Sequence, residues 1–144
     1  KEKPTPVQDE TEDMLAGLAA SEKSVRRWLA AVSGEMLDDD NARQLIGYLR
    51  KNPDADLGEV PLDLQKIEQY VKIVQLKSES RYANWEQKSL DEEMARLVRQ
   101  ITIKHRENKK NQLLMQLRKA EASGDEVLSQ NLRQSLNNLI KEKM

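Results

Sequence analysis

Apolar side chains recur along the chain at spacings of three and four residues, which is the period of an α-helix. No stretch alternates apolar and polar residues with β-branched enrichment, as a half-buried strand would. We therefore predict an all-α fold, in which a helical bundle is followed by a long connecting helix and a C-terminal helical hairpin. The helices are expected to begin near Thr11, Ser21 or Ser24, Asp40, Pro61, Ser89 and Asp125.

Local signals place several helix boundaries in the first half of the chain. Three consecutive aspartates at 38–40 supply a cap and favourable negative charge for the start of the helix that follows them. Pro53 ends that helix, because the residue before a proline is pushed out of the α region. Pro61 suits the first position of the next helix, and the serine-rich residues 78–80 are interpreted as a break within it.

The second half begins with a capping box at Ser89-Leu90-Asp91-Glu92. In this motif the serine hydroxyl accepts from the amide of the glutamate, whose carboxylate reaches back to the capping residue. It predicts the start of the longest helix, which runs to about Ala122. Gly124 then fits the left-handed residue that ends a helix, and Asp125 fits the N-cap of the next one. Two helices joined so closely form an αα-hairpin.

The longest predicted helix is not uniform, because the nine residues between Ile103 and Leu113 include no large apolar side chain. A helix that is polar on every face bridges solvent between two packed regions. We therefore divide the chain into a linker (1–10), a bundle subdomain (11–103), a polar helical bridge (104–112) and a hairpin subdomain (113–144). The expected core of the bundle includes Trp28, Leu45, Ile46, Leu49, Ile67, Val71, Leu97 and Ile101.

The hairpin carries more apolar residues than one contact between two helices can bury. Leu128, Leu132, Leu136 and Leu139 form a stripe, which is expected to close against Leu113, Leu114, Leu117 and Ala120. Met115 and Ile140 lie to the side of it, near Arg118 and Arg133. Surplus apolar surface usually marks a partner site. The predicted partner-binding residues are Leu113, Met115, Leu117, Arg118, Leu132, Arg133, Leu136, Leu139 and Ile140.

The composition narrows the class of protein. Of 144 residues, 38% are hydrophobic and 34% are charged, with a net charge of −1, so a folded but surface-rich helical protein is expected. The absence of cysteine agrees with a reducing compartment, and no apolar run is long enough for a membrane span. The polar, proline-broken start suggests a fragment of a longer protein with a linker attached; the alternative is a native N-terminus that has lost its initiator methionine.

Candidate chemistry is sparse. The single histidine, His105, stands among lysines and arginines and lacks the second histidine or cysteine of a zinc site. Consecutive aspartates at 38–40 point about 100° apart on a helix, so helix capping explains them better than metal binding. The five dispersed glycines form no phosphate-binding loop. We therefore expect no enzymatic activity in this chain, no cofactor and no metal.

Nucleic-acid binding is an alternative function. Residues 90–144 hold eleven Lys or Arg against eight Asp or Glu, and the basic stretch 99–110 could contact phosphates. No aromatic residue follows Trp85, however, so no base-stacking platform accompanies that stretch. This argues against direct contact with nucleic acid. A third alternative is a structural protein that dimerises through its hairpin.

A polar linker leads into Thr11–Leu18 (TEDMLAGL), and Ser24–Trp28 (SVRRW) and Asp40–Leu49 (DNARQLIGYL) follow. The hairpin then carries Ala120–Glu126 (AEASGDE) between two leucine-bearing helices. In order and spacing, over about residues 11–144, these segments resemble the C-terminal helicase-binding domain of bacterial DNA primases.

The resemblance implies a bundle, a long connecting helix and a terminal hairpin that dock on the N-terminal domains of the replicative hexameric helicase. It implies a primosome component in the bacterial cytoplasm, whose zinc-binding domain and primer-synthesising transferase domain lie before residue 1. A homodimer formed by exchange of hairpins is an additional expectation, since the polar bridge packs little and can bend.

Overall fold

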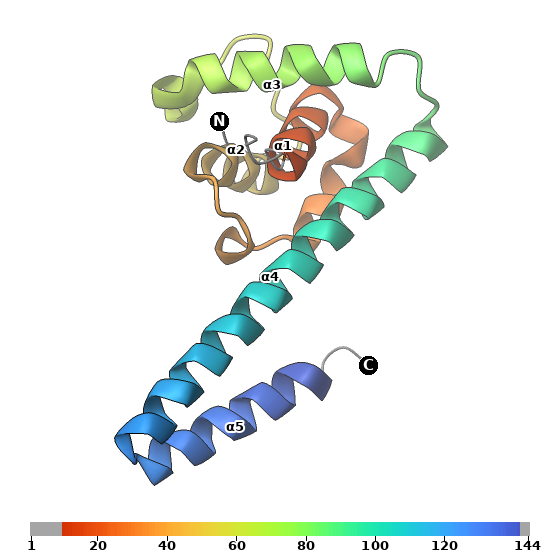
Figure 1. The fold of residues 1–144 in the computed structure, drawn as a ribbon. Coiled ribbons are helices and arrows are strands. Elements are labelled where there is room, and N and C mark those ends of the chain that lie inside the picture. The colour runs from red at the N-terminus through yellow and green to blue at the C-terminus, as the bar shows by residue number, and fades with distance from the viewer. Residues whose placement is uncertain (1–9, 142–144) are drawn as a thin grey trace, which may run out of the picture. The chain divides into compact units, whose positions relative to one another are not determined.

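The computed structural model describes residues 10–141, and within that range every regular element is a helix (Figure 1). The predicted all-α fold is therefore confirmed. In chain order the elements are α1 (Thr11–Ser21), the 3-10 helices η1 (Lys23–Ala31) and η2 (Gly34–Met36), α2 (Asp40–Lys51), the 3-10 helix η3 (Leu62–Ile67), α3 (Glu68–Arg81), α4 (Gln87–Ser123) and α5 (Glu126–Lys141).

The chain divides into two compact units between Thr102 and Ile103. The first unit, called the bundle below, contains every element from α1 to α3 and the beginning of α4. The second, called the hairpin unit, contains the rest of α4 and α5. The polar stretch 104–112 lies in the hairpin unit, and His105, Arg106, Glu107 and Lys110 within it are half-buried.

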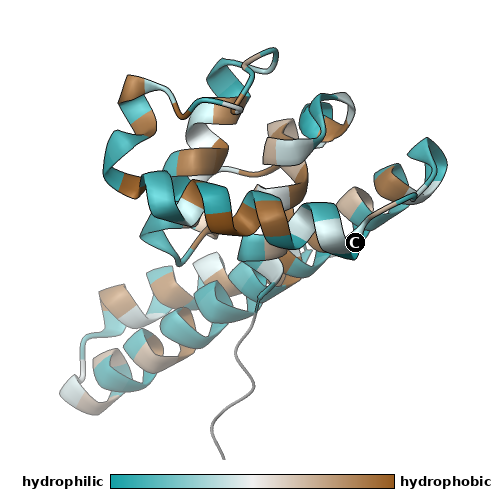
Figure 2. Ribbon diagram, turned by 90° about the horizontal axis from the view of Figure 1, so that it is seen from above, coloured by the Kyte–Doolittle hydropathy of each residue, from teal (hydrophilic) through white to brown (hydrophobic). Residues whose placement is uncertain are grey.

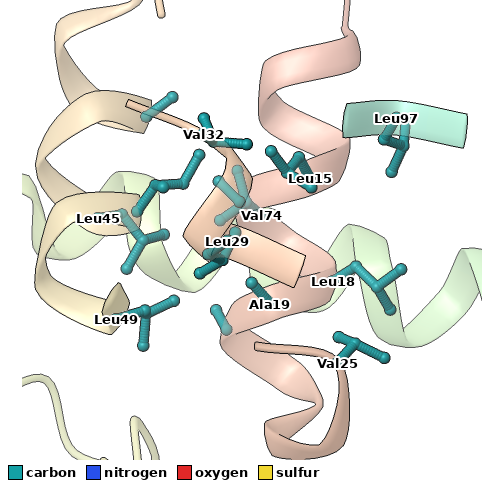
Figure 3. Close-up of a cluster of buried hydrophobic side chains, with 14 of the residues drawn as sticks. Leu15, Leu18, Ala19, Val25, Leu29, Val32, Leu45, Leu49, Val74 and Leu97 are labelled. Carbon is teal, nitrogen blue, oxygen red and sulfur yellow. The ribbon is translucent and has the colours of Figure 1, made fainter. Parts of the chain in front are cut away.

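The bundle has a single apolar core, to which α1 contributes several fully buried side chains (Figure 3). Seven of the eight residues predicted for the core are buried, and the eighth, Trp28, is half-buried at its edge. Helices α1 and α3 approach closely because Gly17 has no side chain: a Cβ there would collide with the backbone oxygen of Val74. Small residues at this crossing therefore set the distance between the two helices.

The predicted break at residues 78–80 is wrong, since α3 continues to Arg81. Ser78 is 1% exposed and its hydroxyl lies 3.0 Å from that of Ser21 on α1. A small polar side chain is used here to pack two helices rather than to end one. The chain turns instead between α3 and α4, where Asn84 adopts a φ of 65°, a conformation that asparagine tolerates better than most residues.

Two predicted N-caps are also wrong. The longest helix begins at Gln87, and Leu90 N already donates to Glu86 O at 3.0 Å, so Ser89 lies within the helix and caps nothing. Neither Ser21 nor Ser24 caps η1, because Ser21 donates back to the Gly17 oxygen and Ser24 donates to Gln87 Oε1 at 2.9 Å. Ser21 and Ser24 each have a hydrogen-bond partner outside the expected turn.

Arg26 is a buried cation that the sequence analysis did not identify, although it lies next to Val25 on the inward face of η1. Its side chain is 4% exposed. It donates to the backbone oxygens of Ala19, Ala20, Pro53 and Ala55 at 2.7, 3.0, 3.0 and 2.6 Å. The first two are carbonyls of the last turn of α1, which otherwise lack partners. Arg26 therefore completes the C-terminus of α1 and fastens the loop after α2 to it.

The turn of the hairpin has the geometry that was predicted. Gly124 has a φ of +78°, Gly124 N donates to Glu121 O at 3.2 Å, and Asp125 N donates to Ala120 O at 3.0 Å. These two bonds are those of a Schellman motif. Asp125 Oδ1 then accepts from Leu128 N at 3.0 Å, which confirms it as the N-cap of α5.

Candidate functional site

The hairpin unit buries one line of side chains where α5 runs along the end of α4, called the seam below (Figure 1). Ala120, Ser129, Leu132 and Leu139 are buried there, and Leu113, Leu117 and Leu136 are half-buried. Five of the nine predicted partner-binding residues, namely Leu113, Leu117, Leu132, Leu136 and Leu139, therefore hold the two helices together, and their apolar area is largely used within the chain.

The other four predicted residues lie on the surface. Met115 and Ile140 are 60% and 48% exposed, and Arg118 and Arg133 are exposed as well. Arg133 donates from Nη2 to Glu121 Oε2 at 2.8 Å, which joins α5 to α4 beside the seam. An exposed ion pair of this kind contributes little to stability, so it does not prevent Arg133 from contacting a partner. All four residues are therefore available for contact.

The two exposed apolar residues do not share a face. Met115 is two residues from Leu113 and two from Leu117, so it points about 200° away from both. Since those leucines face the seam, Met115 faces away from α5. Ile140 directly follows the buried Leu139 and lies at the edge of the seam. The structure thus offers two separate apolar contact points where one was expected.

Two further exposed apolar residues were missed as surface positions. Val127 and Leu128, in the first turn of α5, are 73% and 45% exposed. Leu128 was predicted to belong to the stripe that closes the hairpin. That prediction is wrong, because the turn leaves Leu128 exposed next to the seam. Apolar segments separated by polar ones are visible along both hairpin helices (Figure 2). The hairpin unit therefore presents apolar side chains at its turn, on α4 and near the end of α5.

Within the hairpin unit, the cations of the basic stretch 99–110 lie mostly on one side of α4. Relative to Lys104, helical geometry turns Arg106, Lys109 and Lys110 by about 200°, 140° and 240°. Arg106 and Lys110 are half-buried, whereas Lys104 and Lys109 are exposed. Arg106, Lys109 and Lys110 therefore share one side of α4, and Lys104 points away from them.

Tyr82, Glu93 and Arg96 form a hydrogen-bonded network in the bundle. Tyr82 Oη donates to Glu93 Oε2 at 2.6 Å, and Arg96 donates to both Glu93 oxygens at 2.7 and 2.8 Å. The Arg96 contact is the main reason why the pKa of Glu93 is lowered. Burial raises the pKa of Tyr82. This network ties the start of α4 to the end of α3.

The two tryptophans occupy different surroundings. Trp28 donates from Nε1 to Asp91 Oδ1 at 2.9 Å, and Arg27 lies 5.8 Å above its ring and 3.1 Å from Asp91. It forms one wall of a shallow hollow lined also by Lys88, Glu92 and Ala95. Trp85 is 42% exposed and meets the ring of Tyr82 edge-on at 4.8 Å. Both lie at the rim of the bundle.

Across residues 10–141, no group of three or more His, Cys, Asp or Glu side chains gathers as metal ligands would. In the same range, no helix combines the length and the apolar character that a membrane span requires. Comparisons with protein-family models, with curated proteins and with solved structures found no match to this chain.

Proposed function

We propose that this chain is a non-catalytic interaction domain of a bacterial DNA primase, and that it docks on the N-terminal domains of the replicative hexameric helicase. Docking would hold primer synthesis at the site of unwinding in the cytoplasm. The observation that carries the proposal is the hairpin unit, whose seam is already filled while Met115, Val127, Leu128 and Ile140 remain exposed.

Covering these side chains with a partner lowers the free energy. Burying one large apolar side chain contributes about 1.5–3 kcal/mol, so each of these separate side chains offers an anchor for a partner. Anchors of this kind, surrounded by polar contacts, supply most of the energy of protein interfaces. The order of helices supports the primase assignment in particular. A bundle, a long helix and a terminal hairpin follow one another, as the resemblance to primase C-terminal domains implies.

The test is co-migration. The chain is mixed with the replicative helicase encoded by the same genome and separated by size-exclusion chromatography. The proposal predicts that the chain elutes with the hexamer, and that a truncated chain ending at residue 111 elutes alone. Elution of the full chain at its own position, with no complex at micromolar concentrations, would refute the proposed function.

A homodimer formed through the hairpins is the second candidate, favoured by the exposure of Val127 and Leu128 at the turn. Sedimentation of the chain alone distinguishes the two. A mass that rises to twice the monomer mass with concentration, and falls back in a Val127→Ser, Leu128→Ser variant, would favour the dimer.

A further inference from the structure

Between residues 108 and 141 of the hairpin unit, the carboxylates lie at or near its turn. From residue 108 to residue 141 the sequence has three, Glu121, Asp125 and Glu126. Asp125 Oδ1 accepts from Leu128 N at 3.0 Å, and Glu121 Oε2 accepts from Arg133 at 2.8 Å. These contacts engage two of these three acids within the chain, and the next carboxylates along the sequence are Glu107 and Glu142.

Cations occupy the lengths of helix on either side of the turn: Lys109, Lys110, Arg118, Lys119, Arg133 and Lys141. Six cations against three carboxylates give this segment a positive field, and the Glu121–Arg133 pair leaves that excess unchanged.

Met115 stands at the centre of a polar and basic face on that part of α4. Its neighbours one helical turn away include Asn111, Arg118 and Lys119, at spacings of four, three and four residues. All four side chains are exposed, and we call these four residues the outer face of α4. An apolar group is thus encircled by hydrogen-bond donors and positive charge.

We infer that the outer face of α4 docks on an acidic protein surface, in which carboxylates surround an apolar pocket that takes the Met115 side chain. The inference rests on the proposed function and specifies the chemistry of the helicase surface. Opposite charges steer the encounter and fix the register, while a methionine adapts its shape to an irregular pocket.

A protein surface fits these residues better than a nucleic acid does. Phosphates would engage Arg118 and Lys119 but would leave Met115 without an apolar partner. No aromatic residue follows Trp85, so no side chain in the hairpin offers a stacking platform for bases. The charge pattern alone fits both kinds of partner, and the exposed methionine decides between them.

The test compares two variants of the full chain with equal changes in net charge. Arg118→Glu, Lys119→Glu reverses the charge of the outer face. Lys23→Glu, Lys88→Glu reverses two exposed cations near helix starts in the bundle, where negative charge suits the helix dipole. Helicity is checked for both, and Arg118→Gln, Lys119→Gln serves as a milder variant. Affinity for the helicase is measured from about 0.05 M to about 0.5 M NaCl.

The inference predicts that charge reversal on the outer face weakens helicase binding about tenfold or more at low salt, mainly through slower association. The glutamine variant should lose less, and the bundle variant should bind as the parent chain does. Normal helicase binding by the outer-face variant would overturn the inference while leaving the proposed function intact.

Two other outcomes would also overturn it. Failure of the parent chain to bind helicase at any salt concentration would refute the proposed function and this inference with it. Salt-dependent binding of the parent chain to a single-stranded oligonucleotide, lost in the outer-face variant while helicase binding is kept, would assign the face to nucleic acid instead.

Discussion

Arg26 donates from Nη1 to the backbone oxygen of Ala55 at 2.6 Å, across 29 positions of sequence. The same guanidinium completes the last turn of α1 through Ala19 and Ala20. One buried cation therefore stabilises two segments that the chain's local signals do not connect. Burial also lowers the pKa of Arg26, although nearby Asp54 and Asp56 oppose that shift.

Replacing Arg26 with methionine should destabilise the bundle by about 3 kcal/mol, because four backbone oxygens lose a charged donor and two of them are buried. Urea denaturation followed by tryptophan fluorescence measures the change. The matched control is Arg27→Met, whose side chain is 67% exposed in its ion pair with Asp91 and should cost about 1 kcal/mol or less. Equal effects of the two substitutions would contradict the role assigned to Arg26.

Gly17 and Gly47 provide a second comparison, since both lie within α-helices. Gly17→Ala should destabilise the bundle by about 1–3 kcal/mol, because the added methyl group collides with the Val74 backbone oxygen and forces α1 and α3 apart. Nothing lies within 4 Å of a Cβ at Gly47. Gly47→Ala should therefore stabilise α2 by up to about 1 kcal/mol. Thermal denaturation measures both changes. If the two substitutions shifted the melting temperature in the same direction, this description of the α1–α3 crossing would be wrong.

The Glu93 carboxylate predicts a dependence of stability on pH. The pKa of Glu93 is lowered in the folded state below its ordinary value of 4.5, first by the hydrogen bond from Arg96. Its contribution is therefore fully present above that ordinary value and is lost as the pH falls through the lowered pKa. Asp13 acts with the opposite sign, because burial raises its pKa and protonation then favours the folded state.

Glu93→Gln isolates the first of these effects. The free energy of unfolding is measured from pH 7 down to pH 3 for the parent chain and the variant. The difference between them should be constant near neutral pH and should shrink in acid. A difference that stays unchanged down to pH 3 would mean that the carboxylate charge contributes nothing there.

The bundle should fold without the hairpin. Its core is made within residues 15–101, and the chain divides at Thr102 and Ile103. A chain that ends at residue 111 should keep a cooperative thermal transition, measured by circular dichroism. Loss of cooperativity on truncation would show that the hairpin is needed to hold the core.

The sequence predicted those elements that depend on neighbours along the chain. Apolar spacing located the helices, and Gly124 with Asp125 predicted the hairpin turn, because a Schellman motif and an N-cap are local structures. The same local reasoning failed at Ser78 and Ser89. Serine favours both helix ends and close helix packing, and only the tertiary structure decides between those uses.

The rest depended on contacts between distant residues. Arg26 pairs with backbone oxygens up to 29 positions away, and backbone acceptors leave no trace in a sequence. The direction in which Met115 points was predictable from the sequence, because a spacing of two residues from Leu113 and from Leu117 turns its side chain away from the seam. The exposure of Leu128 could not be predicted from the sequence. The exact geometry of the turn decides whether this first leucine of α5 lies in the seam or beside it.

Met115 and Ile140, which do not share a face of the hairpin unit, make separate predictions. If both faces contact the helicase, Met115→Ala and Ile140→Ala should each weaken binding, and their effects should add, because distant sites act independently. If one face is free, the corresponding single variant binds as the parent chain does. Titration calorimetry of the two single variants distinguishes these cases.

Calorimetry of the double variant Met115→Ala, Ile140→Ala against the helicase tests the docking of the hairpin most directly. Truncating buried anchors commonly costs about 2 kcal/mol or more, so we expect at least about a thirtyfold loss of affinity at unchanged helicity. The control is Leu62→Ala, Leu76→Ala, which truncates two exposed leucines of the bundle, 87% and 66% exposed, and should bind normally. Normal binding by the hairpin variant, together with weakened binding by the bundle variant, would contradict docking through the hairpin.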